Sequence, residues 1–155
     1  MKIFIIGGSS GIGLSLAKRY ASLGNEVAIC GTNEEKLKKL KDNSDDIKIY
    51  KVDVRDKNEL KSAIDDFSKG NLDLIINSAG IYTNNRTTKL TDKEAYTMID
   101  TNLTGVLNTF EAVRDMMFKN NRGHIAIVSS VAGLLDYPKA SVYARTKMTI
   151  MGVCE

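Results

Sequence analysis

The chain has 155 residues, of which 43% are hydrophobic and 26% charged, and its formal net charge is +3. Such a length and composition fit a single soluble globular domain with a sizeable core. Lysines and acids are interspersed, so no nucleic-acid partner is expected, and no apolar run is long enough to suggest a membrane partner. Cys30 and Cys154 have neither metal nor redox spacing, which predicts a cytoplasmic protein without a bound metal.

Apolar runs alternate with helical patterns along the chain. The expected strands are residues 2–6, 26–30, 47–52, 72–77 and 124–129, and the expected helices are residues 11–23, 36–42, 56–69, 92–119 and 141–155. Asn33, Asp56 and Thr91 have the side chains and spacing of helix N-caps. The second, fourth and fifth strands are nearly continuous apolar runs, as expected where helices cover both faces of a sheet. We therefore predict an α/β fold, a Rossmann-like doubly wound parallel sheet with five strands present.

A glycine-rich turn joins the first strand to the first helix. Its spacing is Gly7-x3-Gly11-x-Gly13, which differs from the standard G-x-G-x-x-G dinucleotide fingerprint. Unpaired N–H groups and the positive dipole end of a helix start attract anions, and glycines let a pyrophosphate approach closely. The turn predicts a phosphate site; taken alone, it is also compatible with a tight connection that binds no ligand.

Polar residues follow the predicted strand ends, where ligands bind to open parallel sheets. These residues are Thr32, Asp53, Asn77 and Ser130. Further along, Tyr143 and Lys147 are four residues apart in the last predicted helix and therefore share a face. A lysine ammonium favours the phenolate of a neighbouring tyrosine, so such a pair can act as an acid and base near neutral pH. Taken alone, this spacing favours an ordinary surface pair.

The order of these motifs resembles the short-chain dehydrogenase/reductase (SDR) family over essentially the whole chain. The resemblance rests on the glycine turn, Asp53-Val54, Asn77-Ser78-Ala79-Gly80, Asn102, Ser130 and Tyr143-Ala144-Arg145-Thr146-Lys147. It implies one NAD(P)-binding Rossmann domain over residues 1–155. It also implies an oxidoreductase that transfers a hydride between a nicotinamide cofactor and a carbonyl or alcohol substrate. The cofactor contacts implied are Gly7, Ser9, Ser10, Gly11, Ile12, Gly13, Thr32, Asp53, Val54, Asn77, Ala79, Gly80, Tyr143 and Lys147.

The resemblance also implies four catalytic residues. Tyr143 would give or take the proton, and Lys147 would bind the nicotinamide ribose and favour the phenolate of Tyr143. Ser130 would hydrogen-bond the substrate oxygen. Asn102 would distort the long fourth helix and hold a water in a proton relay to Lys147.

The end of the second strand predicts NADP as the cofactor, with NAD as the alternative. An acid there would bind the ribose 2′-hydroxyl of NAD and repel a 2′-phosphate, and Thr32 stands at this place instead. Thr32 and Asn33 can donate hydrogen bonds to a phosphate, and Lys36 or Arg55 are candidates to reach it.

Two features depart from the family pattern. Ile6 stands where a threonine is usual, and the chain ends within the helix of Tyr143 and Lys147, before the further strands of the family. We expect a C-terminally truncated domain, either a fragment of a longer protein or a shortened product with an exposed fifth strand. The alternative function is a non-catalytic dinucleotide-binding or interaction module, and an isomerase or dehydratase is a third reading. By resemblance, a homo-oligomer is expected through the long helix and the last helix.

Overall fold

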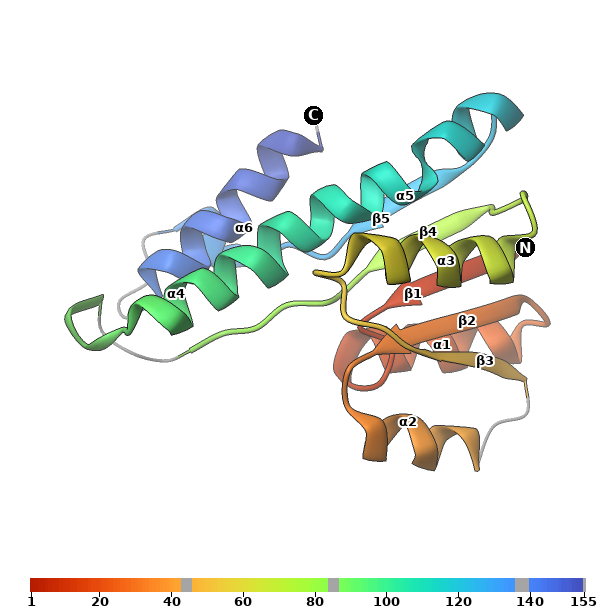
Figure 1. Ribbon diagram of the computed structural model, residues 1–155, viewed down its shortest axis with the longest axis horizontal. Coiled ribbons are helices and arrows are strands. Elements are labelled where there is room, and N and C mark those ends of the chain that lie inside the picture. Colours follow the sequence, from red (N-terminus) through yellow and green to blue (C-terminus); the bar gives the residue numbers. More distant parts are fainter. Residues whose placement is uncertain (43–45, 84–86, 136–139, 155) are drawn as a thin grey trace.

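The computed structural model describes residues 1–42, 46–83, 87–135 and 140–154. Five parallel strands form one sheet in the order β3-β2-β1-β4-β5 (Figure 1). The strands are β1 (Lys2–Ile6), β2 (Glu26–Gly31), β3 (Ile47–Lys51), β4 (Leu74–Asn77) and β5 (His124–Ile127). The chain runs outward from β1 to β3 and then crosses to β4 on the other side of β1. The predicted Rossmann-like sheet is confirmed, and its switch point lies between β1 and β4.

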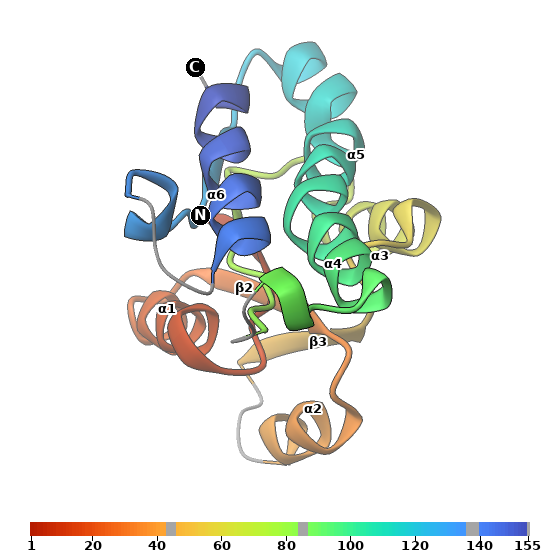
Figure 2. The same ribbon diagram turned by 90° about the vertical axis from the view of Figure 1, so that its left-hand side faces the viewer.

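Helices cover both faces of this sheet (Figures 1 and 2). The main helices are α1 (Gly11–Ser22), α2 (Glu34–Lys41), α3 (Lys57–Ser68), α4 (Asp92–Ile99), α5 (Gly105–Asn120) and α6 (Ser141–Val153). Two short 3-10 turns, η1 (Thr87–Lys89) and η3 (Val131–Gly133), lie in the connections. The last helix was expected to reach Glu155, which lies outside the described residues.

Successive side chains of β1 point to opposite faces of the sheet and enter two hydrophobic clusters. On one face, Phe4 packs in a cluster with Leu60 of α3 and Val113 of α5. On the other face, Ile5 packs in a cluster that includes Ala17 of α1. All five side chains are fully buried. The central strand is therefore covered on both sides, as its continuous apolar run predicted.

The predicted N-caps are confirmed. The side chain of Asn33 accepts a hydrogen bond from the backbone N–H of Lys36 at the start of α2. Asp56 accepts from two backbone N–H groups at the start of α3. Thr91 and Glu94 form the reciprocal capping box of α4. These local hydrogen bonds satisfy the donors that each helix start leaves open.

The sequence predicted one long helix over residues 92–119, and the structure divides it. A π-helical turn, η2 (Asp100–Thr104), separates α4 from α5 and carries the fully buried Asn102. The expected distortion at this residue is therefore present. The helical spacing of apolar residues continues through the π-helical turn. Spacing alone therefore predicts a single helix over residues 92–119.

The fifth strand differs from its prediction in length and in burial. It ends at Ile127 rather than at residue 129, and its residues are half-buried or exposed. In the described part of the chain β5 pairs only with β4, so it is an edge strand. Its apolar run predicted a strand covered on both faces, and this prediction is wrong for β5. Within the described ranges, no helix combines the length and apolar character that crossing a membrane requires. The cytoplasmic location stays a prediction.

Candidate active site

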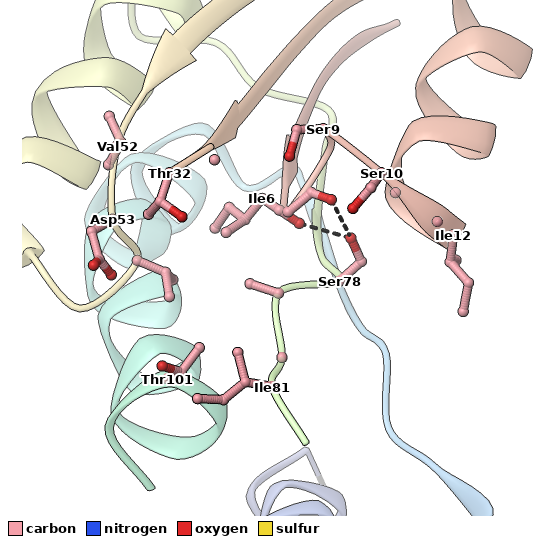
Figure 3. A pocket seen from close by; sticks show the side chains of 17 residues that line it. Ile6, Ser9, Ser10, Ile12, Thr32, Val52, Asp53, Ser78, Ile81 and Thr101 are labelled. Atoms are coloured by element: carbon pink, nitrogen blue, oxygen red, sulfur yellow. Dashed lines mark hydrogen bonds between the residues drawn. The ribbon is translucent and has the colours of Figure 1, made fainter. Parts of the chain in front are cut away.

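A cleft of about 310 Å³ opens at the carboxyl ends of β1, β2 and β4, next to the switch point of the sheet (Figure 3). Most of the predicted cofactor residues line it: Gly7, Ser9, Ser10, Gly11, Ile12, Gly13, Thr32, Asp53, Val54, Ala79 and Gly80. The sequence analysis missed six further lining residues: Ile6, Gly31, Val52, Ser78, Ile81 and Thr101. Five of these six are direct chain neighbours of predicted cofactor residues, and Thr101 precedes the predicted Asn102, so adjacency was the signal that could have found them.

The glycine turn forms one wall of the cleft, and two of its glycines have left-handed backbone conformations. Gly7 has φ +77°, and a Cβ there would stand 2.7 Å from the backbone nitrogen of Ala79. Gly11 has φ +54° and no neighbouring atom within 4 Å of its missing Cβ. Position 7 therefore requires glycine for packing and conformation, and position 11 leaves open space above the turn.

The start of α1 presents hydrogen-bond donors to this space. The first backbone bond of the helix runs from Leu14 N to Ser10 O at 3.1 Å, so the N–H groups of residues 11–13 have no intrahelical partner. Within the described part of the chain, Ser10 makes no side-chain capping bond to them. Free N–H groups, a positive dipole end and a bare glycine surface fit the phosphates of a dinucleotide.

Ser78 fastens the turn to the end of β4. Its Oγ donates to the carbonyl oxygen of Ile6 at 2.8 Å and lies 3.4 Å from that of Gly7 (Figure 3). A Cβ on Gly13 would overlap this hydroxyl. The serine therefore holds the strand end and the turn together within the cleft wall.

At the far end of the cleft, Asp53 is paired with Arg55. The guanidinium Nε donates to both carboxylate oxygens at 3.0 Å, and the backbone N–H of Arg55 donates at 3.0 Å as well. These hydrogen bonds lower the pKa of Asp53, so it is ionised and can accept hydrogen bonds. Arg55 was a candidate to reach a 2′-phosphate; here it holds Asp53 instead. Thr32 lines the cleft nearby and is exposed.

Asn77 lies behind the cleft wall and does not line it. Its Nδ2 donates to Thr109 Oγ1 at 2.9 Å, and its Oδ1 accepts from the backbone N–H of Ala79 at 2.9 Å. The side chain is 1% exposed. Asn77 therefore shapes the segment that carries Ala79 and Gly80, and the structure gives it no surface in the cleft.

Tyr143 and Lys147 lie on one face of α6, as the spacing predicted. The Nζ of Lys147 is 5.8 Å from the ring centroid of Tyr143. Lys147 is 5% exposed, and its Nζ donates to Val128 O at 2.9 Å. A Cβ on Gly80 would stand 3.3 Å from this Nζ, so the amine reaches the cleft wall. Burial lowers the pKa of Lys147 below its ordinary value.

Ser130 lies at the start of η3, where its Oγ accepts a hydrogen bond from Ala132 N at 3.2 Å. This segment packs against α6, because a Cβ on Gly133 would stand 2.9 Å from the carbonyl carbon of Lys147. The neighbouring Ser129 Oγ donates to Lys147 O at 3.0 Å. The Tyr143 ring, in turn, contacts Tyr82 from the segment after β4, with 5.0 Å between ring centroids.

Comparison with known proteins adds to this geometry. A protein-family model described as short chain dehydrogenase matches residues 1–155. An uncharacterized oxidoreductase of Listeria monocytogenes is 36% identical, with 99% of this chain and 64% of that protein covered. Serine dehydrogenase from Escherichia coli superposes with a TM-score of 0.90 at 30% identity, covering 97% of this chain and 71% of that one. ElxO with NADP bound gives a TM-score of 0.90 at 30% identity, covering 99% and 65%.

The chain spans roughly half to two thirds of the length of the curated relatives it matches, since it covers 64% of the Listeria protein and 48% of a 3-dehydrosphinganine reductase from Arabidopsis thaliana. The match to the family model is nevertheless continuous over the chain. The five-stranded parallel sheet agrees with the solved structures that superpose on it. The chain belongs to the short-chain dehydrogenase family.

Proposed function

We propose that this protein is an NAD(P)-dependent oxidoreductase that interconverts a carbonyl and an alcohol. One observation carries the proposal: the buried amine of Lys147 reaches Gly80 on a cleft whose other wall is the glycine turn and the start of α1. Neither Tyr143 nor Lys147 lines this cleft, but the amine of Lys147 lies directly behind the wall that faces the donor-lined phosphate site. Residues 1–155 would form a single NAD(P)-binding domain.

The cofactor that we propose is NADP, with NAD as the alternative. Gly7, Gly11 and Gly13 would hold its phosphates with the start of α1, and Asp53 would accept a hydrogen bond at the adenine end. Thr32 supports NADP because it places no negative charge beside a 2′-phosphate. The solved structure of ElxO with NADP bound, in a chain of the same fold, supports it too. When bound, the cofactor would supply or accept the hydride.

The side chains of this protein would handle the proton and the orientation of the substrate. In the reducing direction, Tyr143 would donate its phenolic proton to the carbonyl oxygen while the carbonyl carbon becomes an alcohol carbon. Lys147, held by Val128 O, would bind ribose hydroxyls and stabilise the phenolate that remains. Ser130 would orient the substrate oxygen, and Asn102 would shape the wall at Ile81.

The test has two steps. The protein is first titrated with NADPH and NADH, read by nicotinamide fluorescence, against the low background of a chain without tryptophan. A panel of ketones, β-keto esters and aldehydes is then screened for NADPH oxidation. Tyr143→Phe should lower turnover about 100- to 10,000-fold and leave NADPH affinity nearly intact. Tyr96→Phe is the matched control, because Tyr96 is exposed on α4.

Each outcome of this test decides between the two readings of the fold. Turnover that survives in Tyr143→Phe would contradict the assignment of the acid. Binding of NADPH without turnover of any carbonyl would favour the non-catalytic dinucleotide-binding module. Binding of neither nucleotide would contradict the oxidoreductase and the dinucleotide-binding module for this chain, and it would leave the interaction module.

Self-association is part of the proposal. Large apolar side chains are exposed on the two helices that we expect to pair between subunits: Leu107 and Phe118 on α5, and Met148 on α6. A groove of about 510 Å³ lies beside Phe118. Sedimentation velocity at micromolar concentration should show a dimer or larger, and Phe118→Asp should shift it toward monomer. A wild-type protein that sediments as a monomer would contradict this part.

A further inference from the structure

The hydroxyl of Thr146 joins two parts of the candidate site. Thr146 lies on α6 directly before Lys147, and its Oγ1 donates to the backbone oxygen of Tyr143 at 2.7 Å. The same oxygen accepts a hydrogen bond from Nδ2 of Asn102 at 3.2 Å. Thr146 is 4% exposed and Asn102 is fully buried. Loss of the hydroxyl would therefore leave a buried amide N–H without its partner, which is costly away from water.

Asn102 carries this contact to the wall of the cleft. Its Oδ1 accepts from Ile81 N at 2.8 Å, and its Nδ2 donates to Ile81 O at 3.0 Å. An amide side chain has two N–H donors and an acceptor oxygen with two lone pairs, and the bonds to Ile81 and Thr146 engage both donors and one lone pair. Ile81 lines the cleft. The connection therefore runs without interruption from the backbone of Tyr143 through Thr146 and Asn102 to the cleft wall.

Three other helical threonines bond back to the carbonyl four residues earlier, and one of them, the buried Thr109 on α5, also accepts a hydrogen bond from the amide of Asn77. Thr149 on α6 donates to Arg145 O at 2.8 Å, and Thr97 on α4 donates to Lys93 O at 2.6 Å. Both are exposed or partly exposed, and both bond back to the carbonyl four residues earlier, as a helical threonine commonly does. Thr146 instead bonds the carbonyl of Tyr143, three residues earlier, and presents its oxygen to the π-helical turn.

We propose that Thr146 is a positioning residue whose hydroxyl fixes α6, and with it Tyr143 and Lys147, against η2 and the cleft wall. The inference rests on the proposed function, because it names the side chain that places the proton donor relative to the cleft. Without the hydroxyl, α6 keeps its helix but loses its polar link to Asn102. A displacement of about 1 Å in such a site can lower a reaction rate about 100-fold.

The first test needs no substrate or cofactor. Thr146→Val keeps the shape of the side chain and removes the hydroxyl, Thr146→Ser keeps the hydroxyl, and Thr149→Val is the control on the same helix. In the ligand-free protein, the Ile81 amide should exchange with solvent about tenfold faster in Thr146→Val, as expected when one buried hydrogen bond is lost. Thr146→Ser and Thr149→Val should exchange like the wild type. Unchanged Ile81 protection in Thr146→Val overturns the proposal.

The second test asks whether the link matters for chemistry. With NADPH and the most reactive ketone of the panel, Thr146→Val should lower kcat about 10- to 100-fold. The KM for NADPH should change much less, and Thr146→Ser should restore kcat. An equal loss in Thr149→Val, or a defect in Thr146→Val confined to thermal stability, overturns the positioning role. If the wild type neither binds NADPH nor reduces a ketone, the proposed function fails, and the exchange of Ile81 still decides whether the link exists.

Discussion

Gly13 and Ser78 meet in the wall of the cleft, where the hydroxyl of Ser78 fills the space that a side chain at position 13 would need. A Cβ on residue 13 would also stand 2.5 Å from the carbonyl oxygen of Gly7. The same serine hydroxyl donates to Ile6 O (Figure 3). The end of β1, the glycine turn, the start of α1 and the end of β4 are thus packed as one unit, and the donors that face the cleft depend on that packing.

Gly13→Ala should therefore disturb the nucleotide site. The added methyl group must displace Ser78 or the turn, which we expect to cost about 1–3 kcal/mol of folding free energy and to weaken NADPH binding about tenfold or more. Gly152→Ala is the matched control, because Gly152 also lies in a helix and a Cβ there would meet no atom within 4 Å. It should stabilise the protein by up to about 1 kcal/mol. Thermal unfolding and NADPH titration measure both, and wild-type affinity in Gly13→Ala would contradict the packing argument.

The choice between NADP and NAD should depend on the charge at position 32. Thr32→Asp places a carboxylate at the end of β2, where it would repel a 2′-phosphate and accept a hydrogen bond from a ribose 2′-hydroxyl. NADPH affinity should fall about tenfold or more, and NADH affinity should rise. Thr32→Asn has nearly the same size without the charge and should change the ratio little. Equal effects of the two substitutions on fluorescence titrations would show that charge is not the determinant.

Local signals in the sequence predicted much of this fold. Asn33 and Thr91 begin helices because their side chains bond N–H groups only three residues away. The glycine turn could be located because its conformation is a property of a few adjacent residues. The left-handed angles of Gly7 and Gly11 agree with that reading.

The interactions that sequence reasoning missed are long-range. Ser78 bonds the carbonyl of a residue 72 positions earlier, and Asn77 turns toward Thr109, 32 positions later. No spacing rule relates residues so far apart, so Ser78 was read as part of a motif and Asn77 as a cleft residue. Arg55, named with Lys36 as one of two candidates to reach a phosphate, pairs with Asp53 two positions earlier, so this contact is local. The role of Tyr143 remains a prediction that Tyr143→Phe tests, and the roles of Ser130 and Lys147 remain predictions as well.

Lys147 should make stability depend on pH in a specific direction. Its pKa is lowered in the folded state by burial and returns to the ordinary value of 10.5 on unfolding. Below the folded pKa both states are protonated, and the cost of burying the ammonium is fully present. Between the folded pKa and 10.5, folding releases a proton, so stability rises with pH in that window.

The comparison is between the wild type and Lys147→Met, which keeps the length of the side chain without its charge. The free energy of unfolding in urea should increase in the wild type relative to Lys147→Met between about pH 7 and about pH 10. Lys18→Met is the control, because Lys18 is exposed on α1. Its unfolding free energy should follow the wild type over the same pH range. A difference between the two proteins that falls or stays constant over this range would contradict the burial of the amine.

Asp66 should make the stability of the protein depend on pH in the acid range, whereas Lys147 does so in the alkaline range. Neither the stability change nor the substitution of Asp66 should affect the cleft. Its carboxylate accepts hydrogen bonds from Lys48 at 2.7 Å, Lys69 at 2.8 Å and Tyr50 at 2.6 Å, and these donors hold its pKa well below the ordinary 3.8. A carboxylate with a lowered folded pKa stabilises the protein above its unfolded pKa, and this contribution is lost as the pH falls toward the folded one. Asp66→Asn should therefore be less stable than the wild type at about pH 7, with a difference that shrinks below about pH 4 and in high salt.

Asp65→Asn is the neighbouring control for Asp66, because Asp65 pairs with Lys61 within the same helix turn. It should change the unfolding free energy less than Asp66→Asn does at neutral pH, since it removes one exposed ion pair rather than a carboxylate shared by three donors. NADPH titration should be unaltered in both variants, because neither residue lines the cleft. A loss of NADPH affinity in Asp66→Asn at unchanged stability would contradict this expectation. It would show that the Asp66 network on α3 and β3 is coupled to the nucleotide site.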